Sequence, residues 1–297
     1  MIDKQKLEDL ASILEQSGEY KVLRRLKPRP PVQRQANDEI RLGLFVDVET
    51  TGLDPNKDEI LELAMLPFRY SIDGMVIEVL EPFDRLREPS SPIHPEITAL
   101  TGITDAMVAG KTIDPDEVSR FASPAVLVVA HNAAFDRRFV ERFCPLFATK
   151  PWACSMAEIN WSAEGFEGVK LAYLAARFGF FYERHRAAND CLAALEILSR
   201  TLPRSGVSAL GRLLAQARQS TWRIWAENSP FEFKDKLKVR GYRWNGENNG
   251  RPKSWYIDVP EDSKDMELEF LCREIYRRNV DIGCVKLTAY DRYSGRA

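Results

Sequence analysis

The sequence lacks the features of several protein classes. Its five cysteines are scattered and odd in number, and none forms a Cys-x-x-Cys pair, which argues against a disulfide framework or a zinc site. No apolar run approaches the roughly 20 residues that a membrane-spanning helix needs. The charged start, "MIDKQKLEDL", has no apolar core of signal-peptide length. A net charge of −2 gives no nucleic-acid signal for the chain as a whole. We therefore expect a cytoplasmic protein without a membrane contact.

The chain is long enough for more than one domain. Its 297 residues allow one large domain and a smaller one, and 44% hydrophobic with 29% charged residues is typical of a globular protein. Residues 1–40 form the first segment, in which leucines at helical spacing over 3–17 predict a helix and "KPRPPV" predicts an extended linker. We expect this helix to pack on a neighbouring element, and binding of a partner protein is the alternative.

Residues 41–202 have the pattern of an α/β domain, a mixed sheet with helices on both sides. "LGLFVDVE", "EILELAMLPFRY" and "MVIEVLEPF" are strand-like, with a turn at Asp73-Gly74, and should be antiparallel neighbours. Two short helices joined at Gly102, a helix capped by Asp114, the strand "AVLVVA" and the helix "AAFDRRFVERF" should follow. Helices near "GVKLAYLAARFG" and "AANDCLAALEILSR" should complete the domain.

Two further segments are predicted after this domain. "SGVSALGRLLAQARQSTWRIWAE" predicts a helical connector over residues 203–230, with Leu210, Leu213 and Leu214 on one stripe. Residues 231–297 predict a small C-terminal α+β module that is rich in lysine, arginine and aromatic residues. In it, "EDSKDMELEFLCREIYRR" should be a helix and "GCVKLTAY" a closing strand.

The first predicted strand carries two acids, Asp47 and Glu49, two residues apart. Side chains at positions i and i+2 of a strand point the same way, so both carboxylates should face one spot. Two such charges repel strongly unless a cation lies between them. The alternative is a solvent-facing edge strand with two unrelated acids. The following "TTGLD" weakens that alternative, because its hydroxyls and backbone N–H groups suit a ligand beside the acids.

Two later motifs add chemistry to the same domain. Asp136 follows the strand "AVLVVA", near the carboxyl end of the strand, where α/β folds keep their functional residues. His185 precedes Asp190 by five residues, so Asp190 should lie in the first turn of a helix and His185 in the loop before it. A lone histidine in a loop is more often a solvated surface residue, and the spacing alone leaves that alternative open.

Together, "FVDVETTG", "HNAAFDRRF" and "HRAANDCLAALEIL" resemble the three acidic motifs of the DEDDh 3′–5′ exonucleases, a group that includes the proofreading epsilon subunit of bacterial DNA polymerase III. The resemblance covers about residues 42–202 and implies a ribonuclease H-like fold. "HPEITALTGITDAMV" also resembles the segment that lines the terminal nucleotide in that family. The histidine form of the family needs His-x4-Asp, as here, whereas Tyr182 is too far upstream for the tyrosine variant.

The resemblance implies a role for each motif residue. Asp47, Glu49 and Asp190 would hold one divalent ion and position a water. Asp47 would also bridge to a second ion near Asp136, and His185 would take the proton from the water. All-oxygen ligation favours Mg²⁺ or Mn²⁺, and an imidazole suits a general base. The terminal nucleotide would be contacted by Thr50, Thr51, Gly52, Thr101, Asn132 and Phe135.

The C-terminal module concentrates positive charge. Residues 234–256 hold seven lysines and arginines against Asp235 and Glu247, a local charge of +5, with tyrosines and tryptophans interleaved. This mixture suits single-stranded nucleic acid, because cations follow phosphates and aromatic rings stack on bases. The alternative is a module whose aromatics fill its core while its lysines are solvated. The candidate nucleic-acid contacts are Lys236, Lys238, Arg240, Arg243 and Trp244.

The sequence therefore predicts a metal-dependent 3′–5′ exonuclease, a hydrolase that removes mononucleotides from single-stranded or frayed DNA ends with two Mg²⁺ or Mn²⁺ ions. One alternative is the same chemistry on RNA, as in RNase T and oligoribonuclease. Another is a proofreading-like subunit that acts mainly as a binding partner in a DNA replication, repair or defence complex, through the N-terminal helix or the C-terminal module. The complete set of acids with His185 argues against a catalytically inactive scaffold.

Overall fold

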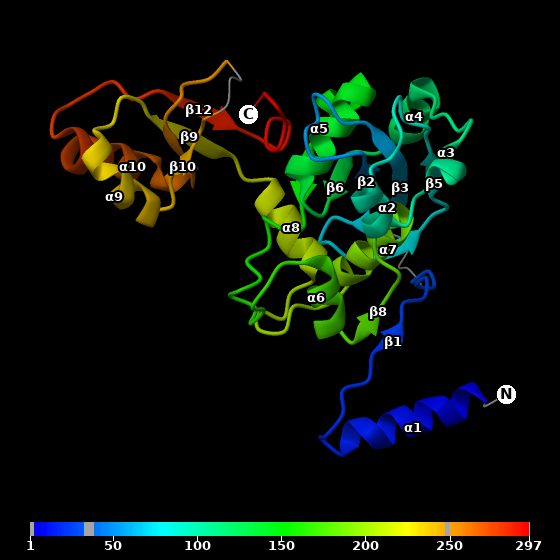
Figure 1. Cartoon of the computed structure of the whole chain (residues 1–297). Helices are drawn as coiled ribbons and strands as arrows, with labels where there is room; N and C mark the ends of the chain where they lie inside the picture. Colours follow the sequence, from blue (N-terminus) through cyan, green and yellow to red (C-terminus); the bar gives the residue numbers. More distant parts are fainter. Residues whose placement is uncertain (1–2, 33–38, 247–249, 297) are drawn as a thin grey trace.

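The larger part of the chain is organised around a six-stranded mixed sheet (Figure 1). In the computed structural model, which describes residues 3–32, 39–246 and 250–296, the strand order is β4–β3–β2–β6–β7, with β5 paired to β3. β2 is antiparallel to β3, and β3 is antiparallel to β4 and β5, whereas β2, β6 and β7 are parallel. This arrangement confirms the predicted ribonuclease H-like mixed sheet. The strands are β2 (Ile40–Thr50), β3 (Ile60–Ser71), β4 (Val76–Val79), β5 (Phe83–Leu86), β6 (Leu127–Ala130) and β7 (Trp152–Cys154).

The first strands form the predicted antiparallel set, with one difference. Gly74 has a φ of +90° in the turn between β3 and β4, as its Asp-Gly pair predicted. The strand predicted over residues 75–83 is two strands, β4 and β5, interrupted before Phe83 by Pro82, which has no N–H for the sheet. Gly74 also permits a close approach of helix α8 (Ala209–Ala217), because a Cβ added there would lie 2.3 Å from the Cα of Gly211.

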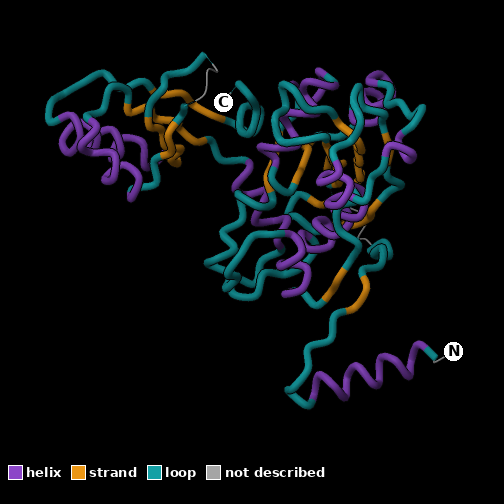
Figure 2. Tube along the Cα trace, viewed as in Figure 1, coloured by secondary structure: helices purple, strands orange, loops and turns teal. Residues whose placement is uncertain are grey.

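Helices cover both faces of this sheet, as Figure 2 shows by colour. Successive side chains of β2 point to opposite faces of the sheet. Phe45 packs in the core with α7 and α8, while Leu44 and Val46 pack in the core with α4 and α5. The short helices α2 and α3 flank Gly102, whose φ of +72° ends α2 as predicted. The helices of this part are α2 (Pro95–Thr101), α3 (Asp105–Val108), α4 (Pro115–Ala122), α5 (Ala133–Phe143), α6 (Leu171–Arg177), α7 (Ala187–Leu198) and α8.

The N-terminal helix α1 (Lys4–Gln16) stands away from the sheet (Figure 1). Its apolar stripe is exposed, by 51% at Leu7 and 64% at Ile13. Arg24 holds the helix through ion pairs to Glu8 and Glu15, at 2.9 and 3.3 Å. The expectation that this helix packs on a neighbouring element is therefore wrong for the described residues. No helix in the described part of the chain is long and apolar enough to span a bilayer.

The proline-rich linker after α1 is extended and lies against the larger domain, which we define as residues 39–217. β1 (Arg24–Arg25) pairs in parallel with β8 (Phe180–Phe181). Arg29 then forms an ion pair with Glu196 of α7, at 3.1 Å. The linker is thus fixed by backbone pairing at one end and by a carboxylate at the other.

The helical interpretation of residues 203–230 is wrong beyond Ala217, where α8 ends. Leu210, Leu213 and Leu214 do lie on one buried stripe, and they complete the core beneath α7 instead of bridging two domains. Residues Thr221–Ala226 form β9, a strand of the C-terminal sheet. Helix α8 is therefore part of the larger domain, and the chain enters the C-terminal module directly through a strand.

The C-terminal module is a four-stranded antiparallel sheet in the order β10–β11–β9–β12, with two helices beside it (Figure 1). Its core is built from Ile224, Leu237, Tyr242, Leu271 and Ile275. The elements are β10 (Arg243–Trp244), β11 (Trp255–Pro260), β12 (Cys284–Leu287), α9 (Lys234–Val239) and α10 (Lys264–Phe270), and a π-helical turn over Leu271–Tyr276 continues α10. The predicted α+β character of this module agrees with these elements.

Residues 288–296, which we call the return segment, leave the module and pack on the larger domain. The fully buried Arg137 of α5 donates to the backbone oxygens of Tyr290 and Arg292, both at 2.6 Å. Arg296 forms an ion pair with Glu141 at 2.7 Å. The module is therefore attached to the larger domain at both of its ends.

Candidate active site

The acids of the first strand lie together at one end of the central sheet. One carboxylate oxygen from each of Asp47, Glu49 and Asp190 lies within 4.8 Å of the others. Asp47 and Glu49 point the same way because they are two residues apart on β2, and Asp190 comes from the first turn of α7. The first and the third motif segments, which lie more than a hundred residues apart in the sequence, thus meet at a single point.

These acids line a cavity of about 170 Å³. His185 and Asp136 line the same cavity, so all five residues predicted as catalytic are brought together. Asn132 and Phe135, two of the predicted nucleotide contacts, also line it. The volume and the lining suit one small polar group beside an aromatic ring.

Asp190 is held by two hydrogen bonds. The hydroxyl of Tyr182 donates to its Oδ1, and the backbone N–H of His185 donates to its Oδ2, both at 2.8 Å. Tyr182 is too far upstream in sequence to act as the base of the tyrosine variant, and in the structure it orients the carboxylate instead. The pattern of the sequence did not reveal this positioning role.

His185 adopts a left-handed backbone conformation, with a φ of +60°. Non-glycine residues seldom adopt this conformation, and it is found preferentially at functional sites. It occurs in the loop directly before α7 and turns the residue so that it lines the cavity next to Asp190. The alternative of a solvated surface histidine does not agree with this placement.

Asp136 lies beside the three-carboxylate group but outside it. Its side chain is almost completely buried, and its Oδ1 accepts a hydrogen bond from the backbone N–H of Val48 at 3.2 Å. It reaches this position from the first turn of α5, which follows Asn132 in a left-handed conformation. The structure thus joins Asp136 to β2 through the backbone of Val48, and both residues line the same cavity.

Burial raises the pKa values of all four acids, and repulsion by neighbouring carboxylates adds to the shift for Asp47, Glu49 and Asp136. Burial, followed by the charge of Asp190, raises the pKa of Glu49 to about 8. Burial likewise raises the pKa of Asp136 to about 8, although its hydrogen bond from Val48 opposes the shift. The pKa of Asp47 lies well above its usual range because of burial and then the charge of Asp136. The pKa of Asp190 is also raised by burial. A bound cation would offset this repulsion, and an all-oxygen donor set fits Mg²⁺ or Mn²⁺.

Four predicted nucleotide contacts do not line the cavity. The Thr50 hydroxyl donates to the Gly52 carbonyl at 2.6 Å, and the Thr51 hydroxyl donates to Asp58 at 3.3 Å. A Cβ at Gly52 would lie 2.5 Å from the Asp58 carboxylate, so this glycine is needed for the packing of the loop. The Thr101 hydroxyl donates to the backbone of its own helix α2, at Ile97. The structure therefore shows these residues in local contacts, and their predicted contact with the terminal nucleotide stays a prediction.

An ion pair between Arg186 and the fully buried Glu62 supports the site, and none of the sequence motifs pointed to it. Glu62 is fully buried on β3, directly across from Glu49 of β2. It accepts hydrogen bonds from the Arg186 side chain at 2.9 and 3.0 Å and from the N–H of Ala187 at 3.0 Å. The available signal was a single acid within the otherwise apolar "ILELAM", since a buried carboxylate requires a partner.

His131 closes one wall of the cavity. Its Nε2 lies 2.8 Å from the carbonyl oxygen of Val169, and its Nδ1 lies 2.9 Å from the hydroxyl of Ser155. Since a carbonyl can only accept, Nε2 carries the hydrogen. Burial lowers the pKa of His131 to about 4, so the ring stays neutral at physiological pH. The hydrogen bond from His131 to Val169 thus connects the turn before α5 to the segment before α6.

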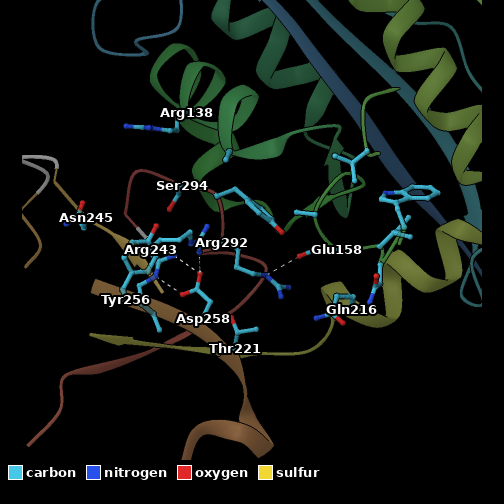
Figure 3. A pocket seen from close by; sticks show the side chains of 18 of the residues that line it. Arg138, Glu158, Gln216, Thr221, Arg243, Asn245, Tyr256, Asp258, Arg292 and Ser294 are labelled. Atoms are coloured by element: carbon cyan, nitrogen blue, oxygen red, sulfur yellow. Dashed lines mark hydrogen bonds and ion pairs between the residues drawn. The ribbon is translucent and has the colours of Figure 1, made fainter. Parts of the chain in front are cut away.

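The candidate nucleic-acid residues of the module lie in different environments. Lys236 pairs with Glu274 at 2.6 Å, and Arg240 pairs with Glu267 at 2.9 Å. Arg243 lies on β10, on the side facing the larger domain (Figure 3), and Trp244 is 55% exposed at the sheet edge. Lys238 is exposed on α9. Glu247, which entered the sequence-based charge count, lies outside the described residues.

Similarity to known proteins involves mainly the larger domain. The family model described as RNase T, exonuclease, matches residues 44–198, more than half of the chain. A DNA polymerase III subunit epsilon-like protein of Rhodobacter capsulatus is 35% identical over 195 residues, which are 61% of this chain and 27% of that protein. The DNA polymerase III subunit epsilon of Aquifex aeolicus is 29% identical over 181 residues, which are 58% of this chain and 87% of that protein.

Among solved structures, Exonuclease X in complex with 5′-overhanging duplex DNA is similar, with a TM-score of 0.41 and 27% identity, over 57% of this chain and 99% of that chain. The chain spans only about a quarter of the length of the Rhodobacter protein, 27%. The matched region, residues 44–198, includes every motif acid and His185. The chain therefore belongs to the RNase T exonuclease family.

Proposed function

We propose that this protein is a metal-dependent 3′–5′ exonuclease that hydrolyses phosphodiester bonds at the 3′ end of DNA, preferring single-stranded or frayed ends. The observation that supports this most directly is the convergence of Asp47, Glu49 and Asp190 within 4.8 Å in the cavity that His185 also lines. The preference for DNA over RNA is supported by the relatives, whose names are those of DNA polymerase subunits.

The carboxylates would hold two divalent cations, Mg²⁺ or Mn²⁺. Asp47, Glu49 and Asp190 would bind one of them, and Asp47 with Asp136 would bind the other, directly or through water. When bound, such cations make a water nucleophilic at neutral pH and stabilise negative charge on the attacking and leaving oxygens. The raised pKa values of the four acids agree with a site whose charges are balanced by a ligand.

The remaining residues of the cavity have complementary roles. His185 would accept the proton of the attacking water, and its backbone N–H keeps Asp190 oriented at 2.8 Å. Asn132 and Phe135 would hold the terminal nucleotide, with the ring of Phe135 next to the sugar or base and the amide of Asn132 toward a polar atom. The predicted roles of the N-terminal helix and the module in binding a partner protein stay predictions.

The test is a degradation assay with 5′-labelled and 3′-labelled single strands of DNA and RNA, with Mg²⁺, Mn²⁺ or a chelator. We expect the 5′-labelled DNA to shorten one nucleotide at a time, no degradation in chelator, and no cutting of a circular single strand. Asp47→Ala should abolish the activity, and Asp116→Asn, which changes an exposed acid on α4, should not. Cleavage of the circle, or cleavage by Asp47→Ala above a few per cent, would contradict the proposal.

A further inference from the structure

A second cavity, of about 840 Å³, lies between the larger domain and the C-terminal module. We call it the interdomain cleft. Figure 3 shows its walls, with Arg138 on one side and Arg243, Tyr256 and Asp258 on the other. The return segment contributes Arg292 at its base. The cleft is therefore built by three parts of the chain that are distant in sequence.

The interdomain cleft adjoins the candidate active site. The hydrogen bond between His131 and Val169 joins a residue that lines the catalytic cavity to a residue that lines the cleft. Helix α5 also contributes to both, because Phe135 lines the catalytic cavity while Ala134 and Arg138, one turn apart, line the cleft. A chain whose end occupies the catalytic cavity would meet the cleft next.

The charge of the cleft is opposite to that of the whole protein. Of the described residues, five arginines and three carboxylates line it, which leaves an excess of two positive charges in a chain of net charge −2. All of the cations are arginines, and none is a lysine. The planar guanidinium matches a phosphate with two hydrogen bonds and also stacks on aromatic faces, so this composition suits a nucleic acid strand.

The module presents its arginines in a fixed arrangement. Asp258 accepts from Arg223 at 2.7 Å and from Arg243 at 2.9 Å, so one carboxylate holds two guanidinium groups. Both groups also lie over the ring of Tyr256, at 4.6 and 4.9 Å from its centroid. Arg223 is only 12% exposed, whereas Arg243 is 61% exposed. The buried arginine neutralises Asp258, and the exposed one keeps its charge available in the cleft.

Strand β9 of the module has one face toward the interdomain cleft and the other toward the module core. Arg223 and Trp225 of β9 line the cleft, while Ile224 between them packs in the core with the helices. Lys236 and Arg240 do not line the cleft, and their charges are paired with Glu274 and Glu267. The lysines and arginines of residues 234–256, which are continuous in the sequence, thus lie on two different sides of the module.

We infer that the interdomain cleft binds the single-stranded segment that precedes the 3′ nucleotide, through its phosphates, with Arg243 and Arg138 on opposite walls. This inference rests on the proposed function, since it places the 3′ end in the catalytic cavity. It assigns the cleft face of the module, and not its helix α9, to the nucleic acid.

The test measures the binding of 5′-fluorescein-labelled oligothymidylates of 4 and 20 nucleotides to full-length protein carrying Asp47→Asn, which prevents degradation. Arg243→Ala should weaken the binding of the 20-mer by about fivefold, which corresponds to about 1 kcal/mol, and change the binding of the 4-mer much less. For a single strand, each lost phosphate contact lowers the log–log salt slope by about 0.7. Arg138→Ala should act in the same way, and the double variant should lower the slope by about 1.4.

Lys238→Ala is the matched control, because it removes one exposed cation from α9 outside the cleft. It should leave the salt slope and the affinity for the 20-mer unchanged. Equal effects of Lys238→Ala and Arg243→Ala, or unchanged binding by both arginine variants, would overturn the inference. The thermal midpoint of each variant shows whether the module still folds. Degradation of the 4-mer by protein with Asp47 intact tests the proposed exonuclease separately, so that the two failures are distinguishable.

Discussion

The guanidinium group of Arg186 donates to the carboxylate of Glu62 at 2.9 and 3.0 Å, and Glu62 has no exposed surface. This pair joins β3 to the start of α7. Arg186 follows His185 directly, and Glu62 lies across from Glu49, so the pair fixes the loop of the candidate base relative to a candidate metal ligand. Neither Glu62 nor Arg186 is among the described residues that line the catalytic cavity.

We expect Glu62→Gln to lower kcat by about 10-fold, within the range of about 10–100-fold for residues that support metal ligands. The reason is that the neutral amide holds Arg186 less firmly, so the His185 loop loses its fixed position while the substrate contacts remain. KM should therefore change little, and the Mn²⁺ concentration for half-maximal activity should rise. The measurement is steady-state kinetics on a labelled single strand over a range of Mn²⁺ concentrations.

The control for this variant is Glu196→Gln, which weakens a comparable carboxylate–arginine contact, to Arg29, near the other end of α7. A loss of stability alone would affect both variants similarly. If Glu196→Gln lowers kcat and the Mn²⁺ response as much as Glu62→Gln, the positioning role is wrong.

Replacement of His185 tests the candidate base. We expect His185→Ala to lower the turnover rate by roughly 10²–10⁴, the usual contribution of a general base, and to keep most of the metal binding. The pH profile of the rate should differ between the wild type and the variant, because the variant lacks the group that accepts the proton. Asp116→Asn, which changes an exposed acid on α4, should behave as wild type. Identical pH profiles of wild type and His185→Ala would rule out this role.

The raised pKa values predict how stability depends on pH without metal. The folded-state pKa values of Glu49 and Asp136 are about 8, whereas unfolded acids titrate near 4. Between these values the folded protein holds protons that the unfolded chain has released, so the free energy of unfolding should fall as pH rises through this range. In chelator, the Tm should therefore decrease from pH 5 to pH 8.

Addition of Mg²⁺ or Mn²⁺ should raise the Tm, and more so at pH 8 than at pH 5, because the cation binds the deprotonated acids. Asp47→Asn should reduce both the pH dependence and the response to metal, since it removes the ligand shared by both ions. Asp116→Asn should retain them. A metal response of the same size at both pH values, or one that Asp47→Asn retains in full, would contradict this account of the acids.

Removal of residues 289–296 should lower the Tm by about 10 °C. Arg137 would keep its ion pair with Glu141 but lose the carbonyl oxygens of Tyr290 and Arg292. Each hydrogen bond to a charged group contributes about 1.5–3 kcal/mol, and about 1 kcal/mol shifts Tm by 2–4 °C in a domain of this size. Differential scanning calorimetry provides the measurement. Arg137→Met in the shortened protein should recover part of the loss. No recovery would show that Arg137 is not the reason.

Local patterns in the sequence were sufficient to predict which acids group together in the candidate site. They were not sufficient to predict the ion pair that holds the neighbouring elements in place. The spacing of Asp47 and Glu49 on a strand fixes their common direction, and the position of Asp190 after a loop fixes its place in the first turn of a helix. Glu62 and Arg186 are 124 residues apart, and no local pattern relates them. Contacts of this kind depend on how β3 and α7 pack, which a single sequence does not specify.

The elements that were predicted wrongly have a common cause. "TWRIWA" continued a helical leucine pattern, and only its pairing with β11 and β12 shows it to be a strand. The apolar stripe of α1 predicted a packing partner, and Leu7 is exposed among the described residues. In each case the tertiary surroundings decided between two locally acceptable structures.

The return segment has a consequence for the order in which this protein folds. During synthesis, the strands and helices up to α8 leave the ribosome well before residues 289–296 do, and until then Arg137 has no access to the carbonyl groups that it binds in the final structure. The larger domain therefore reaches its final packing only after the module that follows it has been made. In the growing chain, α5, which carries Asp136, therefore gains its contacts with the return segment only after the module has been synthesised.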